Sequence, residues 1–167
     1  RKTWHQWQII TAKRSVTQTA IDHPYAGLES KAWISACKDA ANAHGVKYSS
    51  AQVNNINGKV ITTDQGQFTA EMVYDSRPIQ PPQGMMIQSF IGHEVQTATP
   101  VFDPNTAILM DFRCDQSRGI HFIYILPYSD RQALIESTMF SPTIQPDAFY
   151  EDAIHTYLQE HLGVGQF

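Results

Sequence analysis

Gln88–Phe140 reads QSFIGHEVQTATPVFDPNTAILMDFRCDQSRGIHFIYILPYSDRQALIESTMF, and this segment establishes the architecture of the chain. Its apolar runs are rich in β-branched and aromatic residues, and loops with Pro, Asp, Asn and Gly separate them, which is typical of β-strands. The runs predict four strands, over residues 86–96, 107–113, 120–126 and 132–138. A single carboxylate, Glu136, lies in the last run among apolar and hydroxyl side chains. Glu is seldom buried, so a carboxylate in such an apolar run is a candidate functional residue.

Upstream of this segment, the sequence predicts strands, one helix and a β-meander. A strand is predicted over 3–10, a loop over 21–27 and a helix over 29–44. The helical spacing places on one face Trp33, Ala36, Cys37, Ala40 and Ala41, mostly small side chains that would let the helix approach a sheet closely. A short strand is predicted over 46–48. A β-meander follows over 51–70, with a hairpin turn at Asn57-Gly58. A further strand is predicted over 71–75, and a loop over 79–84.

A second helix is predicted to begin near Pro146, with an inner face of Tyr150, Ile154, Tyr157, Leu158 and His161. Helices before and after a strand-rich centre predict an α+β (mixed α/β), sheet-dominated fold with covering helices. A length of 167 residues predicts one domain, or part of a larger one. We expect residues 1–78 to form a helix-plus-meander part, and residues 79–167 a strand-rich part that binds the substrate. The first residue is Arg1, not Met, which suggests a trimmed or excised segment.

The composition is that of a globular protein and argues against some classes of function. A hydrophobic fraction of 42% with 17% charged residues is that of a globular protein, and a net charge of -4 gives no support for nucleic-acid binding. Cys37 and Cys114 have no partner motif, so free thiols in a reducing compartment are expected. The seven histidines show no metal-ligand spacing, so no metal site is predicted.

Four pieces of the Gln88–Phe140 segment follow one another in a family-specific order. They read Gln88-Ser89-Phe90-Ile91-Gly92-His93-Glu94, Leu109-Met110-Asp111, Phe122-Ile123-Tyr124-Ile125-Leu126-Pro127 and Arg131-Gln132-Ala133-Leu134-Ile135-Glu136-Ser137-Thr138. Together they resemble bacterial lycopene cyclases of the beta type. More loosely, residues 3–160 resemble the family, and Val73-Tyr74-Asp75-Ser76-Arg77 is similar to a strand end found in flavoproteins with two dinucleotide-binding domains.

The resemblance implies a lycopene cyclase, which closes the linear end group of a carotenoid into a β-ionone ring without net redox. It implies reduced FAD with NADPH as reductant, lycopene or a related carotenoid as substrate, and a cytoplasmic protein in peripheral contact with a membrane. The chain has no Gly-x-Gly-x-x-Gly turn, so cofactor-binding residues are not assigned and no cofactor is expected on this segment alone. Two alternatives stay open: the substrate domain of a flavin-dependent monooxygenase or other oxidoreductase, and a non-catalytic domain that binds an apolar ligand.

The resemblance also places the site residues. Glu136 occupies the position of the family's acid/base, and its apolar neighbours would raise its pKa; the alternative is a solvent-facing strand residue. Asp111 is either a second carboxylate for the proton or the cation, or a strand-end residue that caps the next turn. The substrate is expected to contact Phe90, Phe112, Phe122, Tyr124 and Met110, whose alternative role is plain core packing.

Three charged or polar neighbours complete the prediction. Glu94 is expected to be structural, on an edge or solvent face of the sheet. Arg131 is expected to pair with Asp130 or to face solvent. Ser137 stands where the resembled family often has an acidic residue, which puts the role of an adjacent carboxylate in doubt.

Overall fold

The computed structural model describes residues 2–77, 82 and 84–165. The chain forms two compact units. The first, here called the sheet unit, comprises Arg1–Glu29 and Pro81–Phe167; the second, the meander unit, is Ser30–Gln80. The expected division near residue 78 grouped the N-terminal strands with the meander, whereas they pair with a strand of the sheet unit.

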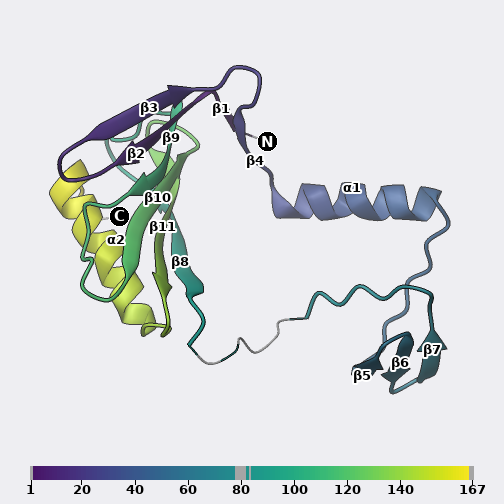
Figure 1. Cartoon of the computed structure of the whole chain (residues 1–167). Helices are drawn as coiled ribbons and strands as arrows, with labels where there is room; N and C mark the ends of the chain where they lie inside the picture. The colour runs from purple at the N-terminus through teal and green to yellow at the C-terminus, as the bar shows by residue number, and fades with distance from the viewer. Residues whose placement is uncertain (1, 78–81, 83, 166–167) are drawn as a thin grey trace. The chain divides into compact units, whose positions relative to one another are not determined.

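A six-stranded sheet forms the centre of the sheet unit (Figure 1). Its strands, in spatial order, are β3 (Ser15–Thr19), β2 (Gln6–Ile10), β9 (Thr106–Asp111), β10 (Ile120–Pro127), β11 (Gln132–Ser141) and β8 (Ile87–Gln96). All neighbours are antiparallel except β2 and β9, which are parallel. The four strands predicted in the Gln88–Phe140 segment are therefore confirmed, and β8 lies at an edge of the sheet.

The helix α2 (Asp147–Leu162) lies along one face of this sheet (Figure 1). It begins directly after Pro146, whose fixed φ suits a helix start, and ends at Gly163 in the left-handed conformation. Four of the five predicted inner residues are buried: Tyr150, Ile154, Tyr157 and Leu158. Ile154, Tyr157 and Leu158 pack in a core that also includes Val95, Ile123, Ile125, Ala133 and Ile135.

The opposite face of the sheet has its own smaller core around Trp4, Ala107 and Leu126. Trp4 belongs to β1 (Lys2–Trp4), which pairs with β4 (Tyr25–Gly27) in a separate two-stranded sheet. Its indole Nε1–H donates to the carbonyl of Pro127 at 3.0 Å, which ties β1 to the end of β10. The strand predicted over 3–10 is thus two strands, because the chain bends at His5 and passes from one sheet to the other.

The meander unit contains α1 (Ser30–Ala43) and a three-stranded antiparallel sheet of β5 (Val53–Asn57), β6 (Val60–Thr63) and β7 (Gly66–Thr69). The predicted helix and meander are therefore confirmed. Gly58 has a φ of 57°, as the tight turn between β5 and β6 requires. Within the meander unit, no described residue of α1 is buried, and Trp33 is 57% exposed.

Two predicted strands, 46–48 and 71–75, are not formed. Both runs have strand-forming composition but no neighbouring strand to pair with, and Tyr74 in the second is 87% exposed. Two strands were not predicted: β3, which pairs with β2, and β4, which lies inside the predicted loop at 21–27. The loop predicted over 79–84 lies mostly outside the described residues.

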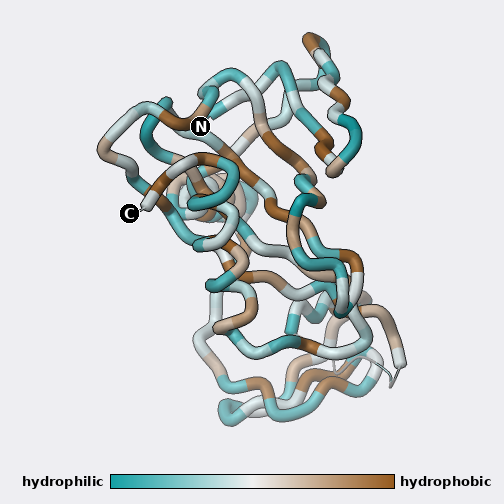
Figure 2. The backbone as a smooth tube through the Cα atoms, turned by 90° about the vertical axis from the view of Figure 1, so that its left-hand side faces the viewer, coloured by the Kyte–Doolittle hydropathy of each residue, from teal (hydrophilic) through white to brown (hydrophobic). Residues whose placement is uncertain are grey.

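Figure 2 shows hydrophobic and hydrophilic residues interspersed along the backbone. The central strands β9 and β10 are mostly apolar, and they contribute side chains to the cores on both faces of the sheet. Among the described residues, no helix is both long and apolar enough to span a bilayer.

Candidate active site

Glu136 points away from α2, onto the opposite face of the six-stranded sheet. Successive strand residues point to opposite faces, and the flanking Ile135 and Ser137 are buried on the side that α2 covers. Glu136 pairs with Tyr124 of β10 on one side and with Gly92 of β8 on the other. We call this side the aromatic face, defined by Phe112, Phe122, Tyr124, Leu126, Leu134 and Glu136, and the α2 side the helix face.

The Glu136 carboxyl is half-buried and unpaired. It forms no hydrogen bond or ion pair with any residue that the structure describes. Burial raises the pKa of Glu136, because the charged form loses solvation without gaining a partner. A carboxyl of this kind holds its proton at a higher pH than an ordinary Glu and is suited to general-acid chemistry.

Apolar and aromatic side chains surround Glu136 in rows across the sheet. The neighbouring row toward the start of β10 contains Phe122, which packs edge-on against Phe112 with ring centroids 5.7 Å apart. Phe122 also contacts Phe140 at 6.2 Å. The row on the other side contains Leu126 and Leu134, which pack in the Trp4 core. The carboxyl therefore has mostly apolar neighbours toward β10, while the exposed Glu94, which pairs with Leu134, lies on the same face at the sheet edge.

Tyr124 lies next to Glu136, and Tyr128, farther along the chain after β10, is close enough to feel its charge. Tyr124 donates a short hydrogen bond to the hydroxyl of Tyr25, and the two rings meet edge-on at 6.2 Å. Burial, together with this bond, raises the pKa of Tyr124, so its phenol stays protonated; the nearby Glu136 adds to the shift. Burial and the charges of Glu94 and Glu136 also raise the pKa of Tyr128.

Tyr25 was missed by sequence reasoning. It is 99 residues from Tyr124 and lies on β4, a strand that the sequence did not predict. Its neighbour Pro24 and the following Gly27 indicated a loop, and no local pattern signals that this loop pairs with β1. Tyr25 also contacts Trp4 at 6.2 Å, which places it over the same face.

Most of the predicted substrate residues lie together. Phe112, Phe122 and Tyr124 belong to the aromatic face, and Met110 points there by alternation with Asp111. Phe90 lies on the same face, since it pairs with Thr138 two residues from Glu136, but it is 56% exposed on the edge strand. The five predicted contacts therefore form one surface with Glu136, and Phe90 forms its outer margin.

Asp111 lies on the helix face and is separated from Glu136 by the sheet. Its carboxylate is fully buried and accepts hydrogen bonds from Arg113 at 2.6 Å and from Tyr157 Oη at 2.6 Å. The backbone N–H of Arg113 also donates to Asp111 Oδ1 at 3.0 Å. Burial works to raise the pKa of Asp111, but these hydrogen bonds outweigh it and hold the pKa below its usual value. The hydrogen bond from the Arg113 N–H favours the second interpretation, a strand-end residue that caps the next turn.

Two expectations about neighbouring charges are also resolved by the structure. Glu94 is exposed on the edge strand β8, as expected for a structural residue. Arg131 is exposed, which agrees with the second of its two expected settings, and it has no ion pair with Asp130. Its guanidinium donates to the carbonyl of Ala98, and its own backbone carbonyl accepts from the N–H of Thr97 at 2.8 Å. Arg131 therefore joins the loop after β8 to the start of β11.

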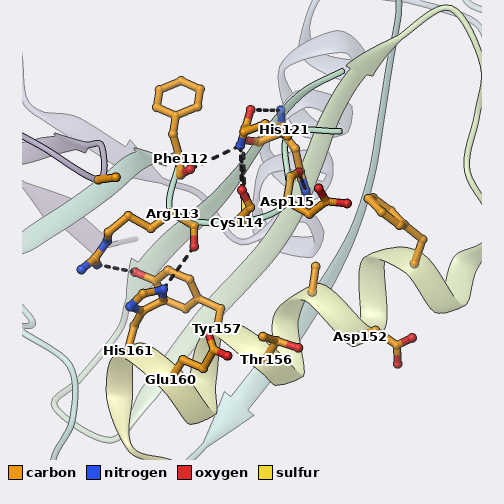
Figure 3. A pocket seen from close by; sticks show the side chains of 14 residues that line it. Phe112, Arg113, Cys114, Asp115, His121, Asp152, Thr156, Tyr157, Glu160 and His161 are labelled. Atoms are coloured by element: carbon orange, nitrogen blue, oxygen red, sulfur yellow. Dashed lines mark hydrogen bonds between the residues drawn. The ribbon is translucent and has the colours of Figure 1, made fainter. Parts of the chain in front are cut away.

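A cavity of about 630 Å³ lies on the helix face, between α2 and the segment after β9 (Figure 3). Arg113, Tyr157 and His161 meet at one end of it (Figure 3), where His161 Nε2 donates to the carbonyl of Arg113 at 3.1 Å. Cys114 also lines it, and burial raises the pKa of this thiol to about 12, so the thiol stays protonated. These contacts anchor α2 to the end of β9.

His121 is fully buried beside this cavity and is held as a neutral imidazole. The carbonyl of Asp115 can only accept, so Nδ1–H donates to it at 2.9 Å, and Nε2 accepts from Ser137 Oγ at 2.8 Å. The ring packs against Phe149 at a centroid distance of 5.2 Å. Burial lowers the pKa of His121, although the Asp115 carbonyl and carboxylate oppose this.

Lowering the pH below about 6.5, the ordinary histidine pKa, is expected to destabilise the protein through His121. The unfolded state takes up a proton there while the folded state does not, so stability falls until the pH reaches the lower folded pKa. A His121→Phe/Ser137→Ala variant removes both the base and its donor, and should lose this part of the pH dependence. Denaturant unfolding at pH values from 5 to 8 measures it.

The control for this experiment is His23→Gln, since His23 is exposed and its replacement should leave the acid-side slope unchanged. Equal slopes for wild type and the double variant would show that His121 does not set the pH dependence.

A family profile described as "Lycopene cyclase protein" matches residues 1–166. The chain belongs to the lycopene cyclase protein family. The resemblance carried by the four motifs of Gln88–Thr138 is thereby confirmed, and the family assignment extends over almost the whole chain.

Two curated lycopene cyclases are similar over part of the chain. A lycopene beta-cyclase of Paracoccus sp. (strain N81106 / MBIC 01143) is 38% identical over 77 residues, which are 45% of this chain and 20% of that protein. A lycopene beta-cyclase of Pantoea ananas is 31% identical over 100 residues, which are 57% of this chain and 26% of that protein. The matches therefore span about a fifth to a quarter of these relatives.

The fold is similar to part of a solved protein structure. The solved structure of the flavin-dependent brominase Bmp2 superimposes with a TM-score of 0.59 over 96% of this chain and 45% of that chain. Sequence identity is 16%, so the likeness concerns the fold alone. The predicted α+β, sheet-dominated, flavoprotein-like fold is confirmed.

The residue after Glu136, Ser137, faces the opposite side of the sheet from Glu136 in this member of the lycopene cyclase family. Ser137 stands where the resembled family often has an acid, and its side chain points to the helix face, at His121 Nε2. Strand alternation would place an acid at this position beside His121 and on the opposite side of the sheet from Glu136. A second carboxylate there would act on the imidazole rather than share the site of Glu136.

Proposed function

We propose that this chain provides the substrate-facing sheet of a lycopene cyclase, which closes the linear end group of lycopene into a β-ionone ring without net redox. One observation carries the proposal: a half-buried, unpaired carboxyl, Glu136, whose pKa is raised by burial and which lies on a largely apolar, aromatic face. Family membership supports the substrate class, and the identity of the product ring belongs to the proposal.

The reaction needs one acid that also serves as a base. The Glu136 carboxyl donates its proton to the terminal double bond of the polyene, which leaves a carbocation and a carboxylate. Ring closure forms one carbon–carbon bond and moves the positive charge onto the ring. Loss of a ring proton to a carboxylate restores the double bond, so atoms and electrons balance without an oxidant. The raised pKa of Glu136 suits both halves of this exchange.

The surface around Glu136 suits a long apolar substrate and a cation. Phe112, Phe122 and Tyr124 present aromatic rings on the same face as the carboxyl. Such faces bind apolar chains through the hydrophobic effect and attract positive charge through the ring quadrupole. We assign these residues, with Met110 and Phe90, to substrate contact.

The cofactor is assigned on family grounds. We propose reduced FAD, with NADPH as reductant, for the polypeptide that contains this chain; the flavin supplies negative charge near the cation. This chain has no Gly-x-Gly-x-x-Gly turn, and none of its described residues is assigned to the flavin. The steps above therefore use only the chain's own residues. Lycopene resides in bilayers, so we also propose a peripheral contact with a membrane.

Expression in lycopene-accumulating cells tests the function. The polypeptide that naturally contains this chain should convert lycopene into cyclised carotenoid, seen by chromatography and absorption spectra. Persistent lycopene with the protein present and folded would contradict the proposal. Consumption of oxygen and NADPH in proportion to substrate would instead support an oxidoreductase acting on an apolar substrate.

A further inference from the structure

Gly92 lies directly beside Glu136 in the neighbouring strand. The two residues are paired in the register of β8 and β11, and both face the aromatic side of the sheet. A methyl group placed on Gly92 would lie 2.8 Å from Cγ of Glu136 and 3.4 Å from its Oε1. Carbon atoms prefer separations of about 3.5–4.0 Å, so the Glu136 side chain occupies the space that any other residue at position 92 would need.

The backbone does not require a glycine at this position. Gly92 is absent from the described glycines with positive φ, which include Gly58, Gly66 and Gly119. It lies within a regular stretch of ten consecutive residue pairs between β8 and β11. Glycine weakens a strand interior, and its presence there commonly marks a close approach of another group. Here that group is the Glu136 side chain.

We propose that Gly92 is a positioning residue for the reaction, which lets the Glu136 side chain lie across the edge strand and fixes where its carboxyl meets the substrate. Leu134 closes one side of this position, since its Cδ1 would lie 3.4 Å from the same methyl group. Tyr124 flanks Glu136 on the opposite strand. With a methyl group on residue 92, the carboxyl has to turn away from β8. The effect of Gly92 on the reaction rate rests on the proposed function.

Gly92→Ala is expected to lower kcat for cyclisation by about 10- to 100-fold with little change in KM, because a displacement of about 1 Å misplaces the reacting proton. The limb of the pH–rate profile that reports Glu136 should also move, since the carboxyl changes its burial. Gly165→Ala is the matched control: a methyl group there meets nothing within 4 Å, and it should leave kcat and the profile unchanged. Wild-type kcat in Gly92→Ala would overturn the proposal, as would a lower kcat with an unmoved pH limb.

A stability cycle tests the same contact without any catalytic assay. Gly92→Ala should lower the denaturant midpoint of the otherwise wild-type protein. In a Glu136→Ala background the clashing Cγ and Oε1 are gone, so the same substitution should leave the midpoint unchanged or raise it. Equal losses in both backgrounds would overturn the assignment of Gly92. If the wild type does not cyclise lycopene, the proposed function fails, while this cycle still decides whether Gly92 positions Glu136.

Discussion

Glu136→Gln is expected to lower the rate of lycopene cyclisation by about 10²- to 10⁴-fold, the usual contribution of a general acid–base group. The amide has nearly the same size as the carboxyl but cannot donate and recover the proton. Since Glu136 forms no hydrogen bond or ion pair with the described residues, the substitution breaks no structural contact among them. Conversion of lycopene by equal amounts of folded protein measures the effect.

Glu94→Gln is the matched control, because Glu94 is an exposed residue on the neighbouring strand and undergoes the same chemical change. It should retain activity. Undiminished cyclisation by Glu136→Gln would remove Glu136 from the reaction.

The stability of Glu136→Gln provides an independent check with a definite sign. Burial raises the pKa of Glu136 above its ordinary value of 4.5, so the folded state holds this proton more tightly than the unfolded state. The wild type therefore loses stability relative to the variant as the pH rises from about 4.5 through the folded pKa. At neutral pH the variant should be at least as stable as the wild type, and a loss of activity caused by unfolding would contradict this.

Asp111→Ala is expected to lower the free energy of unfolding by about 2–3 kcal/mol. Breaking a buried ion pair by removing one partner usually costs more, but the Arg113 side chain is 35% exposed and water can solvate it. The substitution also removes the acceptor of the buried Tyr157 hydroxyl. Denaturant unfolding at pH 7 measures the loss. Cyclisation per folded molecule should persist, because Asp111 lies on the helix face.

Two comparisons sharpen the Asp111 experiment. Asp115→Ala removes an exposed carboxylate whose hydrogen-bond donors, among the described residues, are the N–H and hydroxyl of Ser117 in its own turn, and it should cost far less. The pH dependence also has a definite sign: because the pKa of Asp111 is lowered, its stabilising effect is present above about 3.8 and is lost as the pH falls through the folded pKa. Loss of cyclisation by a fully stable Asp111→Ala would return this carboxylate to the reaction.

The pattern of consecutive residues was sufficient to predict those strands and helices whose partners are close in the sequence. The strands of Gln88–Phe140 are long and bounded by turn residues, and antiparallel neighbours pair them in chain order from β9 to β11. The hairpin at Asn57-Gly58 and the helix after Pro146 follow from the same local rules. The failures, at 46–48 and 71–75, are short runs with strand composition and no partner, since a strand is stable only when another strand accepts its hydrogen bonds.

The candidate acid, Glu136, could be named from its motif and its apolar neighbours, because these are properties of consecutive residues. Its surroundings could not, since they depend on register and on contacts between distant segments. Strand pairing placed Gly92 beside it, put Asp111 on the opposite face, and brought Tyr25 from 99 residues away onto Tyr124. A shift of one residue in any of these pairings would exchange the two faces of the sheet, and only the packed structure fixes the register.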